Sequence, residues 1–196
     1  METIDTQNVG PIEAIMGTNR DEGSTVLFMG LPEMFDRSQP MNLTKTHAIE
    51  FIKLHTKSWW LGDLSNDQIN TIVEFYMSEI QDNDYEGVRQ SLVELIGDSM
   101  FVCPSIYLAD GLSQNNTSKV FYYQFTHIKH FDNYWGEWMG SPHFDDVQYV
   151  FGHPLRYPNN YSEAERQLSL NVINSWTSFA WKGWAVYLKS YLMFSF

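Results

Sequence analysis

The residues with the clearest chemical potential are a histidine, His143, and an acidic residue far upstream, Glu22. His143 follows a Gly-Ser-Pro turn and precedes two aspartates. An imidazole with an ordinary pKa near ~6.5 can take up and return a proton at neutral pH when a carboxylate fixes its tautomer. Glu22 lies in a turn that closes the apolar run 12–16, and the end of a buried strand is where α/β enzymes hold reactive side chains. Glu22 is therefore a candidate for the carboxylate that would orient His143.

Two strands and several helices are expected to position this pair. Residues 12–17 are apolar and end at a glycine, which predicts a buried parallel strand, and the β-branched and aromatic run 120–126 predicts a second strand before the histidine loop. Apolar residues at helical spacing predict helices over 46–53, 65–80, 85–96 and 98–112. Capping-box patterns at Ser65 and Ser162 indicate where two helices begin, the second of them the final helix.

An ordered series of short motifs runs along the chain. It comprises Gly17-Thr-Asn-Arg-Asp-Glu-Gly23, Gly97-Asp-Ser-Met-Phe-Val-Cys-Pro104, Phe121-Tyr-Tyr-Gln-Phe125, Trp138-Met-Gly140 with His143, Tyr149-Val-Phe-Gly-His-Pro-Leu155 and Trp176-Thr-Ser-Phe-Ala180. The series resembles the type-B carboxylesterase/cholinesterase family of α/β-hydrolases. The resemblance implies the α/β class: an incomplete α/β-hydrolase fold, containing the last strands of the central sheet with mainly helical surroundings.

The resemblance also divides the chain. Residues 1–180 are expected to form the C-terminal part of a carboxylesterase type-B domain. Residues 181–196 are apolar and aromatic and depart from the family pattern, so we expect an aberrant tail. Two lysines interrupt this tail, and it is too short to span a membrane.

In a serine esterase a serine hydroxyl attacks the ester carbonyl, histidine transfers the proton, and an acid orients the imidazole. The resemblance assigns the last two roles to His143 and Glu22, in the chain order of α/β-hydrolases. Asp21 is the competing acid, and the match makes it structural. The 196 residues contain no Gly-x-Ser-x-Gly, and neither Ser24 nor Ser141 lies on a strand-turn-helix elbow. The chain is therefore expected to be inactive alone, although its family is that of serine esterases.

The resemblance implies further site residues and several departures. Asp146 falls where cholinesterases carry a buried glutamate that supports the site, whereas Asp145 is expected to be solvated. Trp138 matches the aromatic residue of the cholinesterase Trp-Met-Gly. Phe144 stands where relatives have a small residue. Thr25 and Val26 replace aromatic residues that would line a choline pocket, so the choice between a choline ester and a general carboxylic ester stays open.

Composition and charge exclude other classes of partner. The chain is 43% hydrophobic and 16% aromatic, far from the composition of a disordered protein. The net charge of -12 without a basic patch argues against nucleic acid. His127 and His130 are spaced like a metal pair but no third ligand is arranged nearby, so we predict no metal and no cofactor. The expected partner is a small-molecule ester bound by a full-length parent, whose oligomeric state is open.

Several features indicate a secreted or extracellular membrane-anchored parent. Asn42, Asn115, Asn116 and Asn160 each begin a glycosylation pattern. The first residues are polar, so this chain is expected to lack a signal peptide. In the family the cysteine of this Val-Cys-Pro context forms a disulfide with one nearer the C-terminus, and Cys103 has no such partner here. A buried Cys103 that acts as a small hydrophobe is the alternative.

Two other functions stay open. One is a non-catalytic cholinesterase-like adhesion or binding module, although the retention of Glu22 and His143 argues against it. The other is an independently folded small protein, which would have to depend on a marginal two-stranded sheet. We expect the strand at 12–17 to expose a sheet edge and to promote aggregation of the isolated chain.

Overall fold

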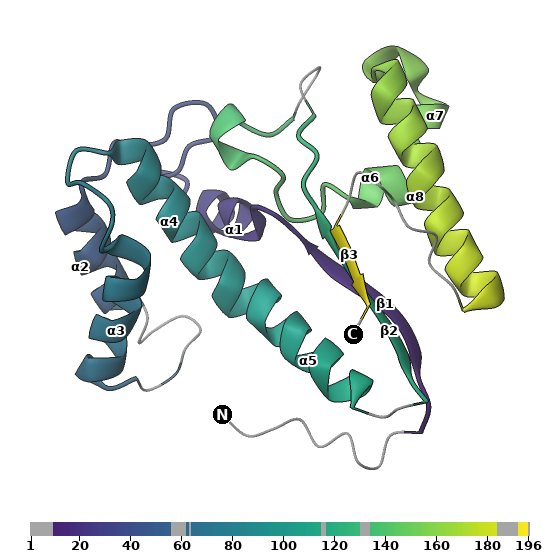
Figure 1. Cartoon of the computed structure of the whole chain (residues 1–196). Helices are drawn as coiled ribbons and strands as arrows, with labels where there is room; N and C mark the ends of the chain where they lie inside the picture. Colours follow the sequence, from purple (N-terminus) through teal and green to yellow (C-terminus); the bar gives the residue numbers. More distant parts are fainter. Residues whose placement is uncertain are drawn as a thin grey trace.

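The computed structural model describes residues 10–55, 62, 64–114, 117–129, 134–183 and 192–195. Its sheet has the strand order β1-β2-β3, with β1 (Glu13–Asn19), β2 (Lys119–Phe125) and β3 (Leu192–Ser195). β1 and β2 are parallel along their whole length, and β3 is antiparallel to β2 (Figure 1). The two predicted strands are therefore present, and part of the tail adds a third.

Helices make up most of the rest of the described chain. They are α1 (Glu22–Gly30), α2 (Lys45–His55), α3 (Asn66–Met77), α4 (Tyr85–Gly97), α5 (Cys103–Ser113), α6 (Val147–Val150), α7 (His153–Arg156) and α8 (Glu163–Lys182). A π-helix, η1 (Asp98–Val102), joins α4 to α5, and short 3-10 turns lie at η2 (Glu137–Met139) and η3 (Pro158–Asn160). Both predicted capping boxes, at Ser65 and Ser162, are formed. Mostly helical structure around a small parallel sheet is consistent with part of an α/β-hydrolase fold.

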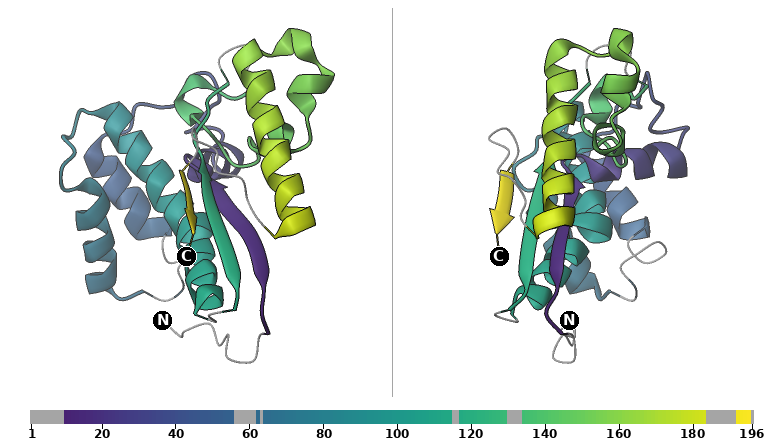
Figure 2. Two further views of the ribbon diagram at one scale, coloured as in Figure 1. Left: turned by 45° about the vertical axis from the view of Figure 1, so that its right-hand side comes forward. Right: turned by 90° about the vertical axis from the view of Figure 1, so that its right-hand side faces the viewer.

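The side chains of β2 alternate between two helices. Val120 and Tyr122 pack on Ala109 of α5, whereas Phe125 packs with Leu168 and Val172 of α8 in a second cluster. Figure 2 shows α5 and α8 on opposite sides of the strands. Because successive strand residues face opposite ways, one strand anchors both helices.

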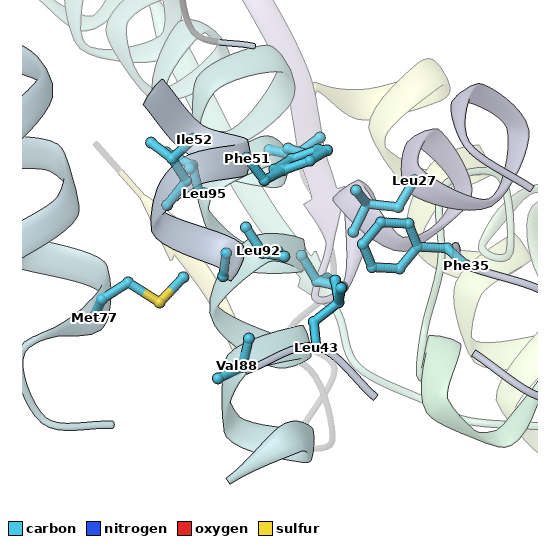
Figure 3. Packing of buried hydrophobic residues seen from close by; sticks show 12 residues of the cluster. Leu27, Phe35, Leu43, Phe51, Ile52, Met77, Val88, Leu92 and Leu95 are labelled. Carbon is cyan, nitrogen blue, oxygen red and sulfur yellow. The ribbon is translucent and has the colours of Figure 1, made fainter. Parts of the chain in front are cut away.

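The largest apolar cluster lies among α1 to α4 and the segment between α1 and α2 (Figure 3). Leu27, Phe35, Ile52 and Leu92 are fully or almost fully buried there. Burial of each such side chain stabilises the fold by about 1.5–3 kcal/mol. This cluster fixes α1, and with it the position of Glu22.

α1 was not expected from the sequence. The sequence patterns predict helices only from residue 46 onward, but residues 22–30 form a helix that begins at Glu22. Glu22 is therefore the first residue of α1 and lies three residues after the end of β1. Residues 192–195, which lie in the predicted tail, pair with β2.

The continuous helical segment Tyr85–Ser113 is long and apolar enough to cross a membrane by length and composition alone. The most apolar stretch of 18 residues in this segment has a mean hydropathy of 1.4, and 33% of that stretch is buried. Val88, Leu92 and Ile96 lie in the helical cluster and Ala109 lies against the sheet. These contacts are those of a core helix.

Candidate active site

Glu22 is held by the junction of β1 and α1. Its side chain is buried, and Oε1 accepts the backbone N–H of Asn19, the last residue of β1, at 2.7 Å. The next residue is Gly23, where an added Cβ would lie 2.1 Å from the carbonyl oxygen of Val93. Only glycine therefore permits α1 to lie this close to α4, which brings Glu22 into its place.

Asp21 holds the histidine loop beside Glu22. Its backbone N–H donates to the carbonyl of Ser141 at 3.0 Å, and the N–H of Ser141 donates back to the Asp21 carboxylate at 2.7 Å. Gly140 has a φ of 63°, and an added Cβ would lie 2.1 Å from that carboxylate. Arg20 pairs with the same carboxylate oxygen at 2.9 Å. Asp21 thus makes structural contacts, although it lies next to the predicted acid in the sequence.

The structure brings Glu22 and His143 together. Nδ1 of His143 lies 2.6 Å from Oε2 of Glu22, and 28% of the histidine side chain is exposed. When Nδ1 carries a proton and donates it to Glu22, Nε2 is the unprotonated nitrogen and can act as a base. Burial raises the pKa of Glu22 above its ordinary value, against the opposing hydrogen bonds of Asn19 and His143.

Asp146 links both strands to the histidine loop. Its Oδ2 accepts the hydroxyl of Tyr123 at 2.8 Å, and its Oδ1 lies 3.4 Å from the side-chain amide of Asn19. The same amide also donates to the carbonyl of Pro142. Burial, together with the Asp146 charge, raises the pKa of Tyr123, and the Asp146 charge also raises that of Glu22. The predicted support residue therefore lies next to the pair.

Asp145 differs from its prediction. It was expected to be solvated, but it is 3% exposed, and Gln148 donates to its Oδ1 at 2.6 Å. Burial raises its pKa to about 6. The short α6, which follows directly, allows Gln148 to cover the carboxylate at i+3. That spacing was the available signal in the sequence.

Trp138 contacts the helical cluster. Its indole N–H donates to the carbonyl of Asp36 at 3.0 Å, and its ring lies 6.2 Å from that of Phe35. It also lines a cavity of about 590 Å³ with Arg37 and Arg89. Trp138 therefore anchors the aromatic loop to the helical cluster, and the contacts described for its ring do not include His143.

The two serines near the pair in sequence are occupied. Ser24 donates its hydroxyl to the carbonyls of Asp21 and Met139, and Ser141 donates to the carbonyl of Phe125. Both side chains are fully buried. Neither hydroxyl is placed to attack an ester.

Two aromatic residues at the pair were missed as site residues. The centroid of the Phe101 ring lies 4.3 Å from the centroid of the His143 imidazole, and the centroid of the Phe144 ring lies 4.1 Å from it. Phe144 was noted in the sequence only as a departure from the family. The sequence did not indicate that Phe101 faces the site. Phe101 lies in the π-helix η1, where the residue spacing of an α-helix does not predict which side chains share a face.

The predicted modification sites have mixed outcomes. Asn42 and Asn160 are exposed, whereas Asn115 and Asn116 lie outside the described residues. Cys103 is exposed at the start of α5, so a buried small hydrophobe is the wrong interpretation of this residue. Burial of its thiol, though partial, and the charge of Asp98 raise its pKa.

Of the two histidines that are spaced like a metal pair, only His127 lies within the described residues. Nε2 of His127 lies 3.2 Å from the carboxylate of Glu165, and His130 lies outside the described part. In that part of the chain, no group of three His, Cys, Asp or Glu side chains is placed to hold a metal ion.

The family model described as "Carboxylesterase family" matches residues 2–187. Acetylcholinesterase-1 of Trittame loki is 35% identical over 178 residues, which are 91% of this chain and 31% of that protein. The acetylcholinesterase of Leptinotarsa decemlineata is 32% identical over 91% of this chain and 28% of its own length, and that of Bungarus fasciatus is 29% identical over 92% and 28%. The chain thus spans less than a third of the length of these relatives. Since the family model covers most of its residues, the chain belongs to the carboxylesterase family.

Proposed function

We propose that this chain is part of a serine carboxylic-ester hydrolase, carboxylesterase-like or cholinesterase-like, and that it supplies the acid and the histidine of the catalytic triad. The observation that carries the proposal is the 2.6 Å contact between Nδ1 of His143 and the buried carboxylate of Glu22. The pair lies where a parallel strand ends and a helix begins, the place where α/β enzymes hold reactive groups.

In this mechanism Nε2 of His143 takes the proton of a serine hydroxyl as the serine oxygen bonds to the ester carbonyl carbon. The tetrahedral intermediate collapses, its bond to the alcohol oxygen breaks, and His143 gives the proton to the leaving alcohol. Water then attacks the acyl-enzyme by the same route and releases the carboxylic acid. Glu22 keeps Nδ1 protonated and stabilises the imidazolium that forms in each step.

Other residues have supporting parts in the proposal. Asp146 holds the strand ends to the histidine loop through Tyr123 and Asn19. Trp138 fixes the aromatic loop on the helical cluster. The substrate is a small-molecule ester, and we propose no cofactor and no nucleic-acid partner. We treat residues 1–180 as the C-terminal part of a carboxylesterase type-B domain and 181–196 as an aberrant tail.

We propose that the chain alone does not turn over esters. Its 196 residues contain no nucleophile elbow, and the hydroxyls of Ser24 and Ser141 already donate to backbone carbonyls. Loss of the nucleophile from a triad lowers kcat by roughly 10⁶-fold. The partner that completes the site would carry the serine and the oxyanion donors.

We also propose that the full-length parent is either a secreted protein or an extracellular protein that is anchored to a membrane. The exposed positions of Asn42 and Asn160 suit glycan attachment. The exposed Cys103 thiol suits a disulfide with a cysteine of the parent. The helical segment Tyr85–Ser113 is treated as a core helix and not as a membrane span, because it packs on both the helical cluster and the sheet.

The test is a chimera in which this chain replaces the matching segment of Acetylcholinesterase-1 of Trittame loki. We expect the chimera to hydrolyse para-nitrophenyl acetate and its active serine to react with a fluorophosphonate probe. The His143→Ala variant should abolish both, whereas His47→Ala, an exposed histidine on α2, should leave both unchanged. Hydrolysis of acetylthiocholine, measured in parallel, decides whether the substrate is a choline ester or a general carboxylic ester.

A chimera that folds but neither reacts with the probe nor hydrolyses the ester would overturn the proposal. Circular dichroism and size-exclusion chromatography establish folding independently of activity. The non-catalytic adhesion module would then become the leading alternative.

A further inference from the structure

Phe144 has a strained backbone. Its φ is 75°, and it is the only non-glycine residue with a positive φ among the residues that the structure describes. A side chain with a Cβ is crowded in this conformation, and an aromatic residue there is a genuine outlier. Its ring is 64% exposed, so burial of the ring does not compensate for the strain. Such strain is retained at sites where the geometry is used.

The strain places an aromatic ring against His143. The centroids of the Phe144 ring and the imidazole lie 4.1 Å apart, with 54° between the ring planes. A second ring, that of Phe101, lies 4.3 Å from the same imidazole at 35°. Phe101 belongs to η1, a π-helix, and π-helical turns are frequent at functional sites.

The hydrogen bond to Glu22 does not by itself fix the imidazole. A bond from Nδ1 to Oε2 sets one distance, but the ring can still turn about that contact and carry Nε2 away from a substrate. Two neighbouring rings limit this turning because they fill the space that the imidazole would sweep through. Rings packed on a histidine also reduce the access of solvent to it.

We infer that Phe101 and Phe144 are positioning residues, which hold the His143 imidazole in the orientation set by Glu22 and restrict its exposure. The catalytic consequence rests on the proposed function, but the positioning itself is a property of this chain. Phe144 is retained for its ring, at the expense of backbone strain that an asparagine or glycine would relieve.

The experiment is proton NMR of the full 196-residue chain, with no substrate present. The ring protons of His143 are assigned by their loss in His143→Asn. Because the rings of Phe101 and Phe144 lie against the imidazole, we expect these signals upfield of those of exposed His47. Phe144→Asn and Phe101→Leu should each move them downfield, and Phe144→Tyr should leave them in place. Phe75→Asn is the matched control, because Phe75 is 78% exposed on α3 and contacts Tyr76.

Two further readouts separate positioning from a merely structural role. Phe144→Asn should raise the melting temperature by about 2–4 °C, because asparagine tolerates a positive φ. The same variant should increase the rate of diethyl pyrocarbonate modification at His143 relative to His47. A more stable variant with a more accessible histidine supports the inference.

Unmoved His143 signals and an unchanged modification rate in Phe144→Asn would overturn the inference. That variant changes an exposed side chain, so it keeps the test decisive even where Phe101→Leu fails to fold. Neither readout requires ester hydrolysis. A failed chimera would therefore count against the proposed function and not against the positioning of His143.

Discussion

The chain contains two histidine–glutamate pairs built to a similar plan. His143 meets Glu22 at 2.6 Å through Nδ1, and His127 meets Glu165 at 3.2 Å through Nε2. Both glutamates are buried and lie in the first turn of a helix. Each also accepts a backbone N–H from the residue three positions earlier, and each of these bonds is 2.7 Å long.

The donors around the two carboxylates differ. The carboxylate of Glu165 also accepts the hydroxyl of Ser162 at 2.8 Å. Burial raises the pKa of Glu165, but the N–H and hydroxyl of Ser162 together with His127 outweigh it, and the pKa lies below its ordinary value. For Glu22, burial prevails and the pKa is raised. The additional Ser162 donor at Glu165 and the Asp146 charge beside Glu22 together separate a carboxylate that stabilises the fold from one held at a cost.

The largest expected difference between the pairs is in catalysis. In the active chimera, Glu22→Gln should lower kcat by roughly 10⁴-fold, because a glutamine amide donates to Nδ1 and selects the wrong tautomer. Glu165→Gln should leave kcat almost unchanged, since His127 contacts α8 and not the proposed site. Initial rates on para-nitrophenyl acetate measure both. Equal losses in the two variants would remove the functional distinction.

The next effect concerns Asp145, the second carboxylate of the site region with a raised pKa. A shift from 3.8 to about 6 means that ionisation of this group lowers the free energy of unfolding by about 3 kcal/mol. The stabilising contribution is present below the ordinary pKa and is lost as pH rises through about 6. Asp145→Asn should therefore lose less stability than the wild type between pH 4 and pH 7.

Urea unfolding at several pH values measures this difference. Asp110→Asn on α5 is the control, because Asp110 is exposed. If the free energy of unfolding changes with pH in the same way for the wild type and for Asp145→Asn, then the ionised carboxylate of Asp145 does not destabilise the fold and the prediction is wrong.

A smaller effect is expected at the cap of α8. Ser162→Ala removes a hydroxyl that accepts the backbone N–H of Glu165 at 3.2 Å and donates to its carboxylate. Loss of such a cap lowers the free energy of unfolding by about 1 kcal/mol. Ser65→Ala in the other capping box is the matched control, because its cap is exposed and involves Gln68, which carries no charge. The Ser162 hydroxyl helps to hold the pKa of Glu165 below its ordinary value, so Ser162→Ala should lose less stability than Ser65→Ala as the pH falls.

Much of this architecture follows from local patterns. The β-branched and aromatic composition of β2, the helical spacing in α2 to α4 and the capping boxes predict elements that are present, because each is a short-range signal. The proximity of Glu22 and His143 needed the family resemblance, since no local pattern joins residues so far apart. The start of α1 at Glu22 was missed, because an apolar run can be buried as a strand or as a helix. The burial of Asp145 and the ring of Phe101 depend on how distant elements pack.

The smallest expected effect is on acid stability, where the two pairs should respond with opposite signs. The lowered pKa of Glu165 gives a stabilising contribution that is present above its ordinary value of 4.5 and is lost as pH falls through the folded-state pKa. The raised pKa of Glu22 gives one that is present below 4.5 and is lost as pH rises. Between pH 3 and pH 6, the stability of the wild type relative to Glu165→Gln should therefore rise, and relative to Glu22→Gln it should fall. Thermal unfolding across this range checks both slopes, and slopes of the same sign would mean that the Ser162 donor and the Asp146 charge do not separate the two carboxylates.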